Sequence, residues 1–172
     1  EILDLKYLFV ETTSNVYYNT NLAPNSAFVS SKIQKDIRKY AESSELNRYG
    51  SRFKYSKFLK VVDQSHESVV SNITTVEIRR DLRLATSEVA EYAIDFGNEL
   101  HIKSMNGFNI RSSAFRVLNV NTDVYLFDVP NTGGKRGQIG LFTLSAGTSS
   151  PIIVRRNIGV INYEIGRITL DP

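Results

Sequence analysis

The spacing of the apolar residues changes partway along this chain, and the change limits the possible folds more than any other feature. In the first half, two stretches place apolar residues every three or four positions, as an amphipathic helix does. Beyond Ala85 the apolar residues occur in short runs separated by glycine, asparagine, aspartate or proline. Such runs are typical of β-strands joined by turns. The sequence therefore predicts an α+β fold with its helices in the first half.

Two helices are predicted in the first half. The first begins at Asn25 or Ser26, because either side chain can accept a hydrogen bond from an amide of the first turn, and it fades by Leu46. The second has Ser56 as its N-cap and is closed by Asn72. Their apolar stripes are Val29, Ile33, Ile37 and Tyr40 in the first, and Phe58, Val62 and Val69 in the second.

A strand is predicted on each side of this helix pair, at Ile2–Val10 and Ile73–Leu84, where the apolar residues alternate with polar ones. The segment between Val10 and the first helix is predicted to be a loop or ragged hairpin. Residues 1–85 are thus expected to form a strand–helix–helix–strand unit, with both helices packed on a small sheet.

Residues 86–172 are predicted to form a second, mostly antiparallel β unit. Its candidate strands are Tyr92–Phe96, Leu100–Lys103, Phe108–Val117, Val124–Asp128, Gln138–Leu144, Ile152–Arg156, Val160–Tyr163 and Arg167–Leu170.

Composition excludes several classes of function. Cysteine is absent, so the chain has no disulfide, no thiolate nucleophile and no cysteine-bound zinc. No apolar run approaches the roughly 20 residues that a helix needs to span a bilayer. The net charge of +3 is small, and its basic excess lies in residues 1–85. A membrane role and a strongly basic nucleic-acid tail are therefore not expected.

A search for reactive groups finds no catalytic, cofactor-binding or metal-binding residue, and no small-molecule substrate is expected. His66 and His101 have no second ligand at helical spacing and are interpreted as surface side chains. Ser113 is expected within a strand rather than in a nucleophile elbow. The glycine-rich stretch Pro130–Gly140 lacks the spacing and the Ser/Thr of a phosphate loop, so it is predicted to be a hairpin with a basic tip.

Pairs of carboxylates are the remaining candidates for acid–base chemistry. Glu88 and Glu91 lie near the predicted unit boundary, while Asp123 and Asp128 bracket a predicted strand. All four are interpreted as solvated carboxylates at the ends of strands.

One segment offers an alternative function, because basic and aromatic residues are interleaved there as single-stranded nucleic acid requires. Phe53 and Phe58 are expected in the core, however, and no nucleic-acid-binding motif is present. Docking of a basic face on an acidic neighbouring protein explains the same residues more simply. The residues are Arg48, Tyr49, Arg52, Phe53, Lys54, Tyr55, Lys57, Phe58 and Lys60, followed by Arg79, Arg80 and Arg83. A second alternative is glycan binding through the tyrosines of Val16–Tyr18.

Several short phrases carry a resemblance to a known family. They are Phe53, Ser56–Phe58, Asp63, Ser68–Val69, Ser71–Thr74, Arg79–Leu82, Ser112–Phe115 and the glycine-punctuated phrase Gly159–Ile168. Together they resemble the C-terminal half of the wedge hinge protein of T-even-type bacteriophage baseplates. The resemblance is weakest in residues 11–25 and 130–150.

The resemblance implies a structural role in the virion, with assembly in the host cytoplasm. Proteins of this family form a ring of dimers that ties neighbouring baseplate wedges together while the plate changes from a dome to a star shape. Homodimerisation and contacts with other wedge proteins are therefore expected, and catalysis is not. Family members are several times longer, so the chain is interpreted as a fragment whose end at Pro172 leaves an unpaired sheet edge.

Overall fold

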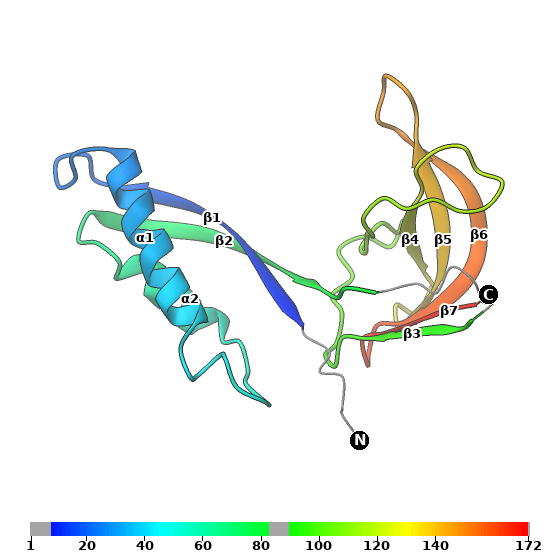
Figure 1. Ribbon diagram of the computed structural model, residues 1–172, viewed down its shortest axis with the longest axis horizontal. Helices are drawn as coiled ribbons and strands as arrows, with labels where there is room; N and C mark the ends of the chain where they lie inside the picture. The colour runs from blue at the N-terminus through cyan, green and yellow to red at the C-terminus, as the bar shows by residue number, and fades with distance from the viewer. Residues whose placement is uncertain (1–7, 83–89, 172) are drawn as a thin grey trace. The chain divides into compact units, whose positions relative to one another are not determined.

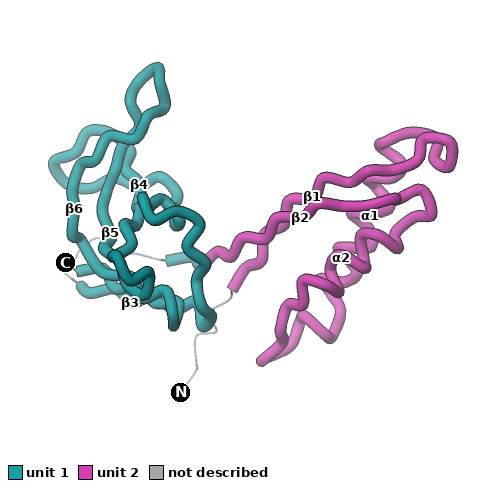
Figure 2. The backbone as a smooth tube through the Cα atoms, turned by 180° about the vertical axis from the view of Figure 1, so that it is seen from behind, with its two compact units in different colours: residues 1–7, 80–172 teal, residues 8–79 magenta. Residues whose placement is uncertain are grey.

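Two antiparallel sheets and two helices make up the part of the chain that the structure, a computed structural model, describes: residues 8–82 and 90–171. Figure 1 shows the order of the elements along the chain. The α+β class and the pair of helices packed on a small sheet are confirmed. The chain divides into two compact units, coloured separately in Figure 2. The unit Leu8–Arg79, magenta in Figure 2 and labelled unit 2 there, comes first along the described chain and is called the first unit here; the teal unit is called the second.

The first unit is a two-stranded antiparallel ribbon with both helices against one face. Its elements are β1 (Phe9–Tyr18), α1 (Ser26–Ala41), α2 (Tyr55–Asp63) and β2 (Val69–Arg79). The ribbon pairs Phe9 with Arg79 at one end and Tyr18 with Val69 at the other. The beginning of the predicted strand Ile2–Val10 and the end of Ile73–Leu84 lie outside the described residues.

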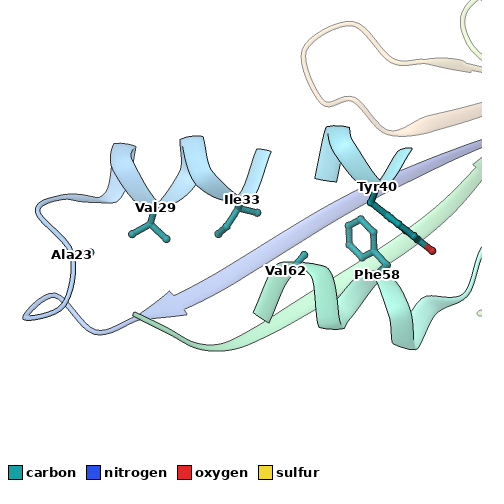
Figure 3. Close-up of a cluster of buried hydrophobic side chains, with 6 residues drawn as sticks. All are labelled: Ala23, Val29, Ile33, Tyr40, Phe58 and Val62. Carbon is teal, nitrogen blue, oxygen red and sulfur yellow. The ribbon is translucent and has the colours of Figure 1, made fainter. Parts of the chain in front are cut away.

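The core of this unit lies between the helices and the inner face of the ribbon. Figure 3 shows side chains of α1 pointing toward those of α2. The buried residues are Ala23, Val29, Ile33, Tyr40, Phe58 and Val62, and Val16, Tyr18 and Val69 of the ribbon pack against them. Val29, Ile33 and Tyr40 of α1 and Phe58 and Val62 of α2 belong to the apolar stripes that the sequence predicted, whereas Val69, predicted in the second helix, lies in β2. Burying such side chains is the main favourable contribution to folding.

The first helix begins as predicted, but the second does not. The side chain of Asn25 accepts a 2.8 Å hydrogen bond from the amide of Phe28 and caps α1. In contrast, α2 follows Lys54 rather than Ser56 and ends at Asp63 instead of Asn72. Asn72 lies within β2 opposite Val16. The chain turns at His66–Ser68 because the imidazole Nδ1 of His66 hydrogen-bonds the Ser68 side chain, at 2.8 Å.

The second unit contains a five-stranded antiparallel sheet in the order β3-β7-β6-β5-β4. The strands are β3 (Tyr92–Asp95), β4 (Tyr125–Pro130), β5 (Arg136–Leu144), β6 (Pro151–Asn162) and β7 (Arg167–Leu170). One face of the sheet carries the cluster Ile139, Ile161, Tyr163 and Ile168. The rings of Phe127 and Phe142 lie on the opposite face, where Phe108 stacks on Phe127 with 5.0 Å between centroids.

Two of the predicted strands, Leu100–Lys103 and Phe108–Val117, are not strands. Phe108 has a positive φ of 62° and its amide donates to the Asp128 carbonyl oxygen. Only Phe115 forms a β-bridge, with Val124. The segment therefore follows the outer edge of β4 without forming a strand ladder.

A bulge divides β6 into two parts. Opposite it, Ile139 pairs with Gly159 and Leu141 pairs with Arg155, so three residues of β6 face Gly140. Within the bulge Asn157 has a φ of 59°, a conformation that asparagine tolerates better than most residues. Gly140 is needed there, because a Cβ atom would lie 2.6 Å from the Phe127 ring and 2.8 Å from the Arg155 carbonyl oxygen.

Candidate interaction surfaces

The basic–aromatic segment, residues 48–60, does not present a row of exposed rings. Phe58 is buried in the core, and the Phe53 ring packs against it with 5.8 Å between centroids. The hydroxyl of Tyr55 donates a 2.9 Å hydrogen bond to the Thr74 carbonyl oxygen. Of these four aromatic residues, Tyr49 is 94% exposed and Tyr55 is 46% exposed. Two of the four rings are thus held in or against the core and cannot stack on successive bases, so the nucleic-acid alternative is not supported.

Several basic side chains that were considered with this segment already contact other residues. Lys57 forms an ion pair with Glu45. Arg79 forms an ion pair with Glu11, and its guanidinium carbon lies 4.7 Å from the centroid of the Phe9 ring. Arg83 lies outside the described residues.

The residues that the sequence analysis considered and rejected as reactive groups do not converge in the structure. His66 is held by Ser68, and its ring makes an edge contact with Phe28 at 5.4 Å between centroids. His101 and Ser113 are exposed, each in an irregular segment of the second unit. Within residues 8–82 and 90–171, no cluster of three or more histidine, aspartate or glutamate side chains is arranged to hold a metal ion.

The glycine-rich stretch Pro130–Gly140 forms the β4–β5 hairpin, as predicted. The amide of Gly134 donates to the Asn131 carbonyl oxygen at 2.8 Å and closes the turn. Lys135 forms a 2.9 Å ion pair with Glu164, and both side chains are largely exposed.

Of the four carboxylates considered for acid–base chemistry, Asp128 was interpreted wrongly. Glu91 and Asp123 are exposed, and Asp123 pairs with Arg116, whereas Glu88 lies outside the described residues. Asp128 is completely buried. No sequence pattern marked it, because its neighbours in YLFDVP suggested only a strand that ends at this carboxylate.

Three donors satisfy the buried Asp128 carboxylate. They are the Tyr163 hydroxyl at 2.6 Å, the Asn109 side-chain amide at 2.6 Å and the Ile110 backbone amide at 2.8 Å. Burial, and then the adjacent Asp128 carboxylate, raise the pKa of Tyr163 above its usual range. All three donors fasten neighbouring segments to the sheet, and the carboxylate itself is buried, so its hydrogen bonds are structural contacts.

Two exposed strand surfaces are stronger candidates for interaction sites than the reactive groups or the basic–aromatic segment. The first is the outer face of the β1–β2 ribbon, which is the side away from the helices. All ten of its residues are exposed: Phe9, Glu11, Thr13, Asn15 and Tyr17 of β1, with Ser71, Ile73, Thr75, Glu77 and Arg79 of β2. Ile73 is 62% exposed and Tyr17 is 56% exposed. Apolar side chains exposed together in this way are typical of interaction sites.

The second surface is the free edge of β6, residues 151–157. All seven residues are exposed, including Ile152, Ile153 and Val154. The loop that joins β5 to β6 projects beyond the sheet (Figure 1). Among the described residues, no helix is long and apolar enough to cross a membrane.

Comparison with known proteins relates both units to a phage tail structure. Residues 6–81, a range that contains the whole of the first unit, match the family model described as baseplate structural protein gp6, C-terminal domain III. The chain is also 27% identical over 169 residues to the baseplate wedge protein gp6 of Enterobacteria phage T4. That alignment covers 94% of this chain and 25% of the T4 protein, so the chain spans about a quarter of its relative's length.

Proposed function

We propose that this chain is a structural part of a T4-type phage tail baseplate, which its similarity to gp6 supports, and that it dimerises and ties neighbouring wedges into a ring. In the same proposal it contacts other wedge proteins, keeps these contacts while the baseplate changes shape during infection, and has no catalytic activity. The T4 relative is itself named as a baseplate wedge protein.

The observation that carries the proposed dimer is the uncovered outer face of the β1–β2 ribbon. A two-stranded sheet is marginal in water unless its faces are covered, and here the helices cover only the inner one. On the outer face, Ile73 lies opposite Asn15 and is two positions from Ser71, which lies opposite Tyr17. The exposed Ile73 and Tyr17 side chains are thus diagonal neighbours that a partner surface can bury.

Charges on the outer face are compatible with a second copy of the same surface. Glu11 and Glu77 lie directly opposite one another, and Arg79 already pairs with Glu11. Glu77 forms no ion pair within the described residues. In a two-fold symmetric contact the same patch meets itself, so Glu77 of each copy can approach a basic residue of the other.

The internal organisation of the chain supports the proposal that the chain stays folded while the surrounding baseplate rearranges. Each of the two units has its own buried core. The groups that could react are instead bonded within these units or isolated on the surface, as for Asp128, His66 and His101. This arrangement favours a role through protein contacts over a role in catalysis.

Sedimentation equilibrium of the full chain, from micromolar to millimolar concentration, tests the dimer. We expect a reversible dimer, which Ile73→Glu converts to a monomer because the charge would be buried in the interface. The matched control is Ile165→Glu, since Ile165 is also half exposed but lies in the β6–β7 turn. A wild-type chain that stays monomeric, or a dimer that only the control dissociates, would contradict this interface.

A further inference from the structure

We infer that the free edge of β6 is a docking site for an extended acidic segment of a different protein, which adds to the sheet as a further strand. The inference goes beyond the proposed dimer, because it concerns a different surface and a different partner.

The backbone of this edge is unpaired on one side. On the other side β6 pairs with β5 before and after its bulge, but β7 pairs only with Gly159–Asn162. The last contact on the β7 side is a 2.9 Å hydrogen bond from the Asp171 amide to the Ile158 carbonyl oxygen. Across the described residues, no backbone or side-chain group bonds the outward edge of 151–157. Such a row of unsatisfied amides and carbonyls is a template for another strand.

The other edges of this sheet are less available. The outer edge of β4 is covered, because the Phe108 amide donates to the Asp128 carbonyl oxygen and Ser112 Oγ accepts from the Leu126 amide. The strand at the opposite side, β3, has only four residues. The free edge of β6 is therefore the longest accessible edge of this sheet among the residues described.

The side chains of the free edge define the chemistry of the partner. Arg155 and Arg156 are exposed and form no ion pair with any described residue. The apolar side chains Ile152, Ile153 and Val154 precede them and are each about 40–50% exposed. Between residues 144 and 163 the chain has no aspartate or glutamate. A strand that carries carboxylates beside apolar residues would complement both features, with backbone hydrogen bonds providing most of the affinity.

A second copy of this chain fits the edge less well. Antiparallel pairing of two free edges would bring four arginines into one ribbon without an acidic residue on either strand. Like charges that face each other across a sheet are destabilising. The charge pattern therefore favours a different, acidic chain over self-pairing.

The test uses the full chain and an end-blocked octapeptide that alternates glutamate and valine, with a lysine–valine octapeptide as the control. Fluorescence anisotropy at low salt measures binding, and hydrogen exchange locates it. We expect the acidic peptide to bind, the basic one not to bind, and the amides of residues 151–157 to gain protection. Reversal of both charges in R155E/R156E should weaken binding by about tenfold or more.

A matched variant distinguishes an effect of the charges on the β6 edge from an effect of the net charge of the chain. Lys103 and Arg111 are exposed residues of the same unit without ion pairs among the described residues, so K103E/R111E changes the net charge equally. We expect this variant to bind the acidic peptide as the wild type does. The proposal is overturned if no peptide binds, if both double variants lose binding equally, or if protection appears elsewhere. It is also overturned if R155E/R156E abolishes dimerisation, because a second copy would then occupy the edge.

Discussion

The Tyr163 hydroxyl donates a 2.6 Å hydrogen bond to the Asp128 carboxylate, and both side chains are buried beneath the sheet of the second unit. Tyr163 follows the end of β6 and Asp128 lies in β4, so one bond connects strands that are separated by β5. Asn109 and Ile110 donate to the same carboxylate. Asp128 therefore joins Tyr163 to the irregular segment that lies beside β4.

Removal of the Tyr163 hydroxyl should destabilise the second unit. In Tyr163→Phe the buried Asp128 carboxylate loses one of its three donors, and we expect the free energy of unfolding to fall by about 1–3 kcal/mol. Urea denaturation measures the change. Tyr125→Phe is the control, because the Tyr125 hydroxyl makes no hydrogen bond among the described residues while its ring stacks on Phe142. Equal losses in the two variants would contradict a special role for the Tyr163 bond.

The same pair predicts a loss of stability in alkali. Burial and Asp128 raise the pKa of Tyr163 in the folded chain, whereas an unfolded tyrosine ionises near its usual value of about 10. Above that pH the unfolded chain binds fewer protons than the folded chain, so the stability contributed by Tyr163 decreases as pH rises. Denaturation at several pH values should show a steeper alkaline decline in the wild type than in Tyr163→Phe. Parallel pH profiles of the wild type and Tyr163→Phe would contradict a raised pKa of Tyr163 in the folded chain.

Gly140 should not tolerate a side chain. The added Cβ of Gly140→Ala would come within 3 Å of the Phe127 ring and the Arg155 carbonyl oxygen. We therefore expect a loss of about 1–3 kcal/mol in stability from overpacking. Gly133→Ala is the matched control, because a Cβ there meets no atom within 4 Å and the φ angle is not positive. Thermal unfolding that ranks Gly133→Ala below Gly140→Ala in stability would refute the close approach.

Truncation of Phe58 should loosen the first unit selectively. This side chain fills the space between α1, α2 and the ribbon, so Phe58→Ala leaves a cavity that costs about 3–5 kcal/mol. Hydrogen exchange of the α1 amides should accelerate, while exchange in the five-stranded sheet remains unchanged. In Tyr49→Ala, which alters an exposed ring of the same segment, exchange should stay at the wild-type rate.

Local signals in the sequence were sufficient to predict part of the fold. Asn25 and the stripe from Val29 to Tyr40 predicted α1 correctly, because a helix cap and a helical apolar period both depend on neighbouring residues. The strand Arg167–Leu170 was also predicted with its observed bounds. Its position beside β6 follows from the tight turn at Gly166, which has a φ of 64°.

Long-range pairing decided the features that were predicted wrongly. The stretch after Val10 is rich in asparagine and threonine and was predicted as a loop or ragged hairpin, yet β1 continues through Tyr18. It does so because Val69–Ile73 pair with it, and that pairing also ends the second helix early. Asp128 was likewise misinterpreted, since its donors Asn109 and Tyr163 are 19 and 35 residues away.

The bulge at Asn157 gives the open part of β6 a fixed length. Beyond it Ile158 is already bonded to Asp171, so an incoming strand must stop there, while Pro151 marks the other limit. At about 3.3 Å per residue of regular strand, the seven open positions span at most roughly 23 Å. The edge would therefore set an upper limit on the length of any strand that adds to it, at about seven residues.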